Sequence, residues 1–286
     1  MHKLYLLILI SVLWSCGEKE IWIKDNVPPP DITVEDIVIE NYIQKCYISL
    51  LGKKANATEL NEAFVLLREN PRDENLRKTF VADLVTKPLY FTNEVNIMRT
   101  DYLNGVDSTE IANQIGIYEF IITTTNNEFE IELFQNEIKR LEALQSGAEK
   151  WMNNLITTAD LHLLCVNNPL YDEINMGSEN FVVSLFQNFA FRYPTVAELE
   201  TGKSLFDGAP SVFLLQSGKN KNDLQDIFFS SKQYYEGVII TLFERYFYRY
   251  PTSFEIEFYS VKLATNKNYT PIQIDLLASK EFMGIK

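Results

Sequence analysis

Residues 181–199 read FVVSLFQNFAFRYPTVAEL and residues 238–256 read VIITLFERYFYRYPTSFEI, and the two stretches align without a gap. A more divergent third copy, YIQKCYISLLGKKANATEL, occupies residues 42–60. In each copy, apolar residues at helical spacing precede a short polar turn, which predicts the buried face of a helix that ends there. The fold is therefore expected to rest on one helix–turn–helix element used three times.

The turn of each copy carries signals for the end of one helix and the start of the next. A basic residue falls in the last turn of the first helix, where it suits the negative end of the helix dipole. A Thr or Asn followed three residues later by Glu predicts a capping box for the second helix. These residues are Lys53, Asn56 and Glu59 in the first copy, Arg192, Thr195 and Glu198 in the second, and Arg249, Thr252 and Glu255 in the third.

Each copy also ends in a similar segment whose last residue is aromatic. These segments are residues 83–90, 227–234 and 275–282. Thr270, Pro271 and Gln273 predict a capped helix start before the last of these. A repeat is thus about 50 residues and three short helices. A long amphipathic helix running from Ile131 to Trp151 is expected in the segment between the first two copies.

The predicted class is all-α, with three related three-helix units and a helical insert between the first and second. The expected organisation is a lipoprotein signal peptide (1–15), a lipidated tether with a Pro-rich spacer (16–35), repeat 1 (36–95), the insert (96–177), repeat 2 (178–236) and repeat 3 (237–286).

The N-terminus indicates where the protein is found. Lys3 precedes an apolar run that is shorter than the roughly 20 residues a membrane-spanning helix needs, which is typical of a secretory signal. Leu13, Trp14, Ser15 and Cys16 then resemble a bacterial lipobox, although Trp14 is bulky for its position. The pattern predicts that Cys16 is acylated and anchors the chain in a lipid bilayer.

The acidic residues that follow Cys16 resemble the surface-export signal of lipoproteins in the Bacteroidota, and Lys19 interrupts them. The resemblance implies a lipid-anchored outer-membrane protein on the cell-surface face, with the periplasmic face as the alternative.

The repeated segments also resemble known helical domains. LLGKKANATEL is similar to the "LGRxPxxxEL" pattern of planctomycete-type secreted domains of unknown function and of phycobilisome-linker-like domains, and residues 155–168 resemble the "LLTADYxxVN" stretch of the former. Many such relatives travel with c-type cytochrome modules, but this chain lacks a C-x-x-C-H motif. The resemblance therefore implies a helical fold without an activity or a haem.

The composition argues against two kinds of binding, to nucleic acid and to metal ions. The chain has 286 residues with 39 acidic and 26 basic side chains, a net charge of −13 that disfavours nucleic acid as a partner. Three cysteines and two histidines make a multi-ligand metal site hard to assemble. Neither a metal nor a cofactor is therefore expected. Cys46 and Cys165 lie in apolar runs and are predicted to be free and buried.

One group of neighbouring residues has the composition of a catalytic set. His162, Asp160 and Cys165 are close enough in sequence for contact on one helix, but they match no known hydrolase motif. A buried structural histidine is the commoner outcome, and the sequence predicts a protein that is not an enzyme.

Two further features bear on function. Asp107, Ser108 and Thr109 resemble an acceptor for O-glycans at Ser108, or else a helix cap. Arg192, Tyr193, Arg249 and Tyr250 either belong to the core or form a repeated protein-interaction surface, because Tyr and Arg are favoured at interfaces. The main hypothesis is a non-enzymatic accessory or scaffold subunit of an outer-membrane secretion, insertion or transport assembly, with a partner such as a β-barrel. The alternative is a surface-exposed glycan- or nutrient-binding lipoprotein.

Overall fold

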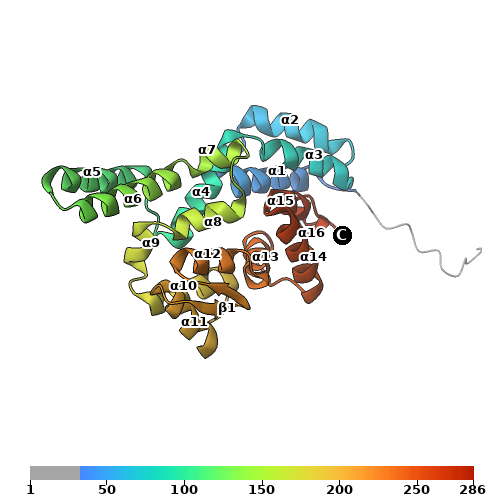
Figure 1. The fold of residues 1–286 in the computed structure, drawn as a ribbon. Helices are drawn as coiled ribbons and strands as arrows, with labels where there is room; N and C mark the ends of the chain where they lie inside the picture. Colours follow the sequence, from blue (N-terminus) through green and yellow to red (C-terminus); the bar gives the residue numbers. More distant parts are fainter. Residues whose placement is uncertain (1–32) are drawn as a thin grey trace, which may run out of the picture. The chain divides into compact units, whose positions relative to one another are not determined.

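The structure is a computed structural model that describes residues 33–286, and residues 34–286 form one compact unit. The signal peptide, Cys16 and the tether up to residue 32 lie outside the described residues, and the expectations for them stay predictions. The described part is built almost entirely of helices, so the prediction of an all-α fold is confirmed (Figure 1).

The first copy of the repeated segment forms a helix, a turn and a capped helix, and two further helices follow. Gly52 ends the first helix with a left-handed backbone (φ 66°), the conformation that glycine adopts without strain. Asn56 and Glu59 form the predicted capping box at the start of the second helix. These elements are α1 (Asp36–Leu51), α2 (Ala57–Arg68), α3 (Glu74–Leu84) and α4 (Pro88–Tyr102).

The insert consists of a long helical hairpin and three short helices. The helix predicted from Ile131 to Trp151 is interrupted at Ser146, whose backbone leaves the helical region, so it is two helices. The elements are α5 (Ser108–Thr124), α6 (Glu128–Gln145), α7 (Gly147–Met152), α8 (Thr158–Val166) and α9 (Pro169–Ile174).

The second and third copies reproduce the same local geometry. Phe191 and Tyr248 occupy the column of Gly52 and are also left-handed (φ 54° each). Thr195 with Glu198, and Thr252 with Glu255, form the predicted capping boxes. The elements are α10 (Ser178–Ala190), α11 (Val196–Phe206), α12 (Lys221–Phe229), α13 (Lys232–Phe247), α14 (Ser253–Asn266), α15 (Thr270–Leu277) and α16 (Lys280–Met283).

Two details differ from expectation. A two-stranded antiparallel sheet, β1 (Ser211–Phe213) and β2 (Gln216–Gly218), lies between α11 and α12. Its strands are too short to produce a detectable alternation in the sequence. The capping box predicted at Thr270 and Gln273 is wrong, because Tyr269 is the N-cap and the Gln273 side chain is committed to a buried cluster described below.

The first and last helices of the unit pack together, although the sequence places them far apart. In Figure 1, the last two helices lie beside the helices of the first copy, with α16 in contact with α1 and α15 in contact with α3. Tyr42 on α1 meets Phe282 on α16 edge-on at 6.1 Å between ring centroids, and Arg77 Nε on α3 donates to the Ala278 carbonyl at 2.7 Å. A single cluster of buried apolar side chains extends from Ile39 to Met283. That the three copies belong to whole repeated units stays a prediction, because a shared turn does not fix how the remaining helices pack.

Candidate interaction surface

The arginines of the repeated turn are held by intramolecular contacts. Arg192 Nη2 lies 2.6 Å from Glu198 Oε1, and the guanidinium sits 4.7 Å from the centre of the Phe186 ring. Arg249 Nη2 lies 2.7 Å from Glu255 Oε1 and stacks on Phe243 at 5.0 Å. The prediction that these basic residues lie in the last turn of the first helix is wrong, because Lys53, Arg192 and Arg249 come two residues after α1, α10 and α13 end. Each arginine instead links a ring of the preceding helix to the capping box of the next.

These contacts perturb the carboxylates. The hydrogen bond from Arg192 lowers the pKa of Glu198 to about 2, and that from Arg249 lowers the pKa of Glu255 to about 2. Arg249 also binds Glu281 on α16, with Nε 2.6 Å from Oε1, and the hydrogen bonds with Glu281 and Glu255 raise the arginine's own pKa. The charged part of each predicted Arg–Tyr pair therefore has a structural role within the chain.

The tyrosines of the same motif lie on the surface. Tyr193 is 69% exposed and Tyr250 is 56% exposed, while their backbone carbonyls accept hydrogen bonds from Arg192 and Arg249. The arginine thus fixes the backbone from which each ring projects. Of the four residues singled out in the sequence, the two tyrosines are the ones whose side chains are free to meet a partner.

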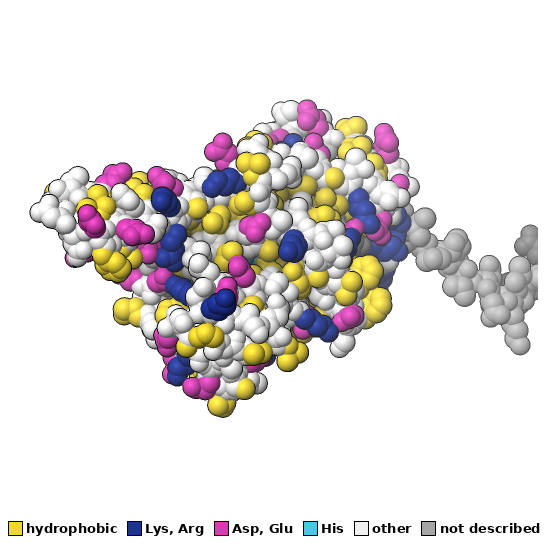
Figure 2. All heavy atoms as spheres, viewed as in Figure 1, with side chains coloured by type: hydrophobic (Ala, Val, Ile, Leu, Met, Phe, Trp, Pro, Cys, Tyr) yellow, Lys and Arg dark blue, Asp and Glu magenta, His cyan; other side chains and the backbone are white. Residues whose placement is uncertain are grey.

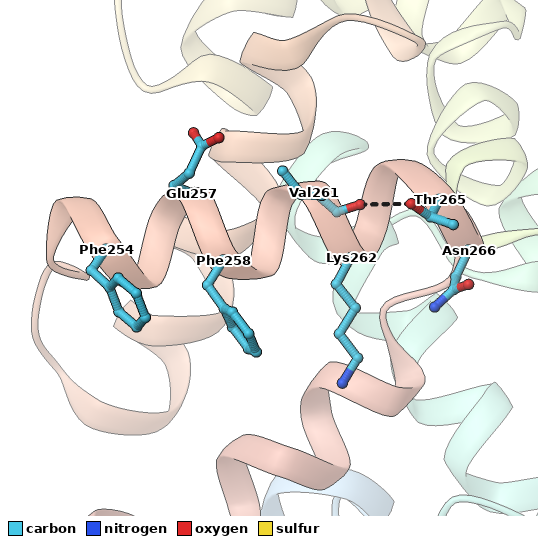
Figure 3. Close-up of a pocket in the computed structure, with 7 residues that line it drawn as sticks. All are labelled: Phe254, Glu257, Phe258, Val261, Lys262, Thr265 and Asn266. Atoms are coloured by element: carbon cyan, nitrogen blue, oxygen red, sulfur yellow. Dashed lines mark hydrogen bonds between the residues drawn. The ribbon is translucent and has the colours of Figure 1, made fainter.

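An apolar groove lies along α14, next to this turn. Phe254 and Phe258 project from the same side of the helix, together with Lys262 (Figure 3). The two phenylalanine rings are stacked, 6.0 Å apart with an interplanar angle of 16°, and they are 77% and 53% exposed. The groove has a volume of about 570 Å³ and continues to Val261 and Asn266.

A second hollow adjoins the groove. It has a volume of about 390 Å³ and lies where the end of α10 meets α13 and the start of α14. Arg192 from one copy and Tyr250 from the other line it, together with Gln233 and Ile240. Glu257 lines both hollows, so they are neighbours on the surface of α14.

Sequence reasoning missed the α14 groove. Phe254, Phe258 and Val261 recur at helical spacing, which is the pattern of a buried stripe. The residues of α14 that are buried are instead Ser260 and Leu263. Periodicity identifies an apolar face but does not say whether another element covers it.

The histidine region is part of the core. His162 Nδ1 lies 2.8 Å from the hydroxyl of Tyr234, and burial, together with the charge of Arg245, lowers its pKa to about 3. Asp160 instead completes the capping box of α8, whose N-cap is Thr157, by accepting hydrogen bonds from the Thr157 amide and hydroxyl. Cys46 and Cys165 are free and buried, as predicted, and burial raises the pKa of the Cys165 thiol to about 12.

A buried polar cluster ties α4, α13 and α15 together. The fully buried Glu94 carboxylate accepts from Arg245 Nη1 (3.1 Å), the Tyr269 hydroxyl (2.6 Å) and Gln273 Nε2 (3.2 Å). Burial acts to lower the pKa of Arg245, but the Glu94 charge outweighs it and raises that pKa. Because every oxygen of Glu94 has a donor, the cluster is suited to fixing helix positions.

The remaining predicted site residue, Ser108, is the first residue of α5. Its hydroxyl accepts a hydrogen bond from Arg99 Nη1 at 3.1 Å, and Asp107 is the residue that caps the helix. Ser108 is exposed, and its glycosylation stays a prediction.

Within residues 33–286, no three His, Cys, Asp or Glu side chains gather in a way that could hold a metal ion. Over the same residues, no helix is long and apolar enough to cross a membrane. Comparisons with protein-family models, with curated proteins and with solved structures found no match to this chain.

Proposed function

We propose that this protein is a non-enzymatic, lipid-anchored accessory or scaffold subunit of an outer-membrane protein assembly, for secretion, insertion or transport, whose partner is a protein such as a β-barrel. The observation that carries the proposal is the stacked, exposed pair of Phe254 and Phe258 on α14, with the exposed ring of Tyr250 lining the neighbouring hollow. Large exposed apolar patches with polar rims are typical of protein–protein contacts.

The rigidity of this surface supports the same function. Tyr250 follows a turn fixed by Arg249, and Phe254 lies in the first turn of a helix capped by Thr252 and Glu255. Aromatic side chains on a fixed backbone lose little conformational freedom on binding, which favours affinity.

The test is extraction of the tagged protein with a mild detergent, followed by mass spectrometry of the proteins that co-purify. We expect a barrel protein in constant ratio, lost in the double variant Tyr250→Ala/Phe258→Ser and retained in Val65→Ser, which removes an exposed apolar side chain from α2. Arg249→Glu would be a poor probe, because it breaks the ion pairs with Glu255 and Glu281.

Two results would contradict the proposal. One is a protein that elutes alone and is retained on a glycan array through the same aromatic residues, which would favour a binding lipoprotein. The other is a barrel partner whose recovery is equal in the wild type and the double variant.

The anchor is tested separately. Cys16→Ser is expected to leave the precursor uncleaved by lipoprotein signal peptidase and without incorporated fatty acid. Normal maturation and membrane retention of this variant would refute the lipid anchor without bearing on the protein partner.

A further inference from the structure

The helical hairpin formed by α5 and α6 projects from the rest of the unit (Figure 1). Its buried residues, Ile111 on α5 and Leu141 and Leu144 on α6, all lie at its base. Arg140 Nη2 also anchors the base, 3.2 Å from Asp172 Oδ2 on α9. With a rise of 1.5 Å per residue, the end of α5 lies about 20 Å beyond Ile111.

The two helices support each other beyond that base. The rings of Tyr118 and Phe134 pack against each other at 5.1 Å, and the Thr125 hydroxyl in the loop donates to Glu130 Oε2 at 2.6 Å. The facing sides of α5 and α6 are therefore packed against each other, and the hairpin is an ordered arm.

The outer faces of the arm expose large apolar side chains. Ile117 and Phe120 on α5 are 52% and 67% exposed, and Phe129 and Leu133 on α6 are 72% and 42% exposed. Each pair is spaced by about one turn, so each helix carries an apolar stripe that no element of the described unit covers. Exposing two phenylalanine rings to water near the tip of one hairpin costs free energy, so we infer that this surface contacts a partner.

The charge of the arm indicates what it binds. Residues 108–138 contain six glutamates and neither lysine nor arginine. Acidic side chains accompany the apolar ones on the projecting end (Figure 2). An anionic lipid surface would repel this arm, whereas a basic protein surface would attract it.

We propose that the tip of the α5–α6 hairpin, with Phe120 and Phe129 as anchors, docks in an apolar groove rimmed by Lys or Arg on a partner protein. The phenylalanines fill the groove, and Glu119, Glu128 and Glu132 face the basic rim. This is a second binding surface, on different elements from the α14 groove, and it does not depend on the function proposed above.

The probe is a fluorescent 18-residue amphipathic helix of Leu and Lys, added to the purified full-length chain. We expect saturable binding that weakens as salt is raised and is reduced at least tenfold by Phe120→Ser/Phe129→Ser. The matched control, Leu155→Ser/Met176→Ser, removes two apolar side chains that are 72% and 70% exposed and lie outside both the arm and the α14 groove, and it should bind the peptide as the wild type does. The same peptide with Glu in place of Lys should not bind.

Three results would overturn the proposal. The first is peptide binding that Phe120→Ser/Phe129→Ser leaves unchanged, which would indicate attraction to net charge alone. The second is phenylalanine-dependent binding to phosphatidylcholine vesicles, which would make the arm a membrane contact. The third is phenylalanine-dependent dimerisation in sedimentation experiments. Circular dichroism verifies that each variant is folded. Because the substituted side chains are exposed, we expect the variants to keep the fold.

Discussion

The lowered pKa of His162 makes the free energy of unfolding depend on pH. Its pKa is about 3 in the folded chain and about 6.5 when unfolded, so the unfolded state binds the proton first as the pH falls. The contribution of neutral, buried His162 to the free energy of unfolding is therefore fully present above pH 6.5 and is lost as the pH falls towards 3. We expect the free energy of unfolding to fall by about 2 kcal/mol between pH 7 and pH 5 because of this residue.

The measurement is urea denaturation of the wild type and of His162→Gln at both pH values. The variant should lack this loss, whatever its absolute stability. The carboxylates Glu198 and Glu255, with pKa values of about 2, lose their stabilising effect only below about pH 4.5 and do not interfere. Equal pH dependence in the two proteins would show that the pKa of His162 is the same in the folded and unfolded states, which would contradict its burial.

The cysteines give a second prediction for individual side chains. Cys46 and Cys165 are at most 1% exposed, and burial raises the pKa of both thiols. In a Cys16→Ser background we expect no thiol to react with a disulfide reagent in native protein, and two to react in denaturant. Either thiol reacting at a native rate comparable to that of glutathione would contradict the buried positions.

At the scale of elements, the capping boxes of the three repeated turns were predictable from sequence, whereas the start of α15 and the α14 surface were not. Thr195 and Glu198 hydrogen-bond within one helical turn, so four consecutive residues determine the contact. The Glu94 cluster joins residues up to 179 positions apart, and no local pattern encodes that proximity. The exposed faces of α5 and α14 share the periodicity of buried ones, so their role depends on packing that the sequence does not display.

The crossing of α10 and α13 yields an element-scale prediction. A Cβ atom on Gly237 would lie 1.8 Å from the Phe189 carbonyl oxygen, so Gly237→Ala must push the two helices apart. We expect a loss of several kcal/mol in the free energy of unfolding, although Ala is the better helix former by about 1 kcal/mol.

Gly116 provides the matched control. It lies in α5, where an added Cβ meets nothing within 4 Å. Gly116→Ala should therefore stabilise the protein by up to about 1 kcal/mol in the same urea titration. Similar effects of the two substitutions would indicate that α10 and α13 do not cross closely at Gly237.

At the scale of the molecule, the sequence suggests separable repeats, whereas the packing indicates cooperativity. Residues of the first copy contact residues of the last through Tyr42 with Phe282 and through Arg77 with Ala278. Trp151 in the insert packs against Tyr90 of α4 and Tyr269, so the insert shares this core. A unit joined in this way should unfold in one step.

Phe282→Ala tests that cooperativity. Phe282 is 5% exposed and lies between Tyr42 and Tyr246, so its truncation should cost about 3–5 kcal/mol. In a Trp14→Phe/Trp22→Phe background, fluorescence reports Trp151 alone, while circular dichroism reports all the helices. We expect the substitution at the far end of the chain to shift both denaturation curves to the same lower midpoint. If the curves separate, with Trp151 retaining its wild-type midpoint while ellipticity falls, the last unit unfolds by itself. The repeats would then be thermodynamic modules, and the contacts between α1 and α16 would add little to the stability of the whole.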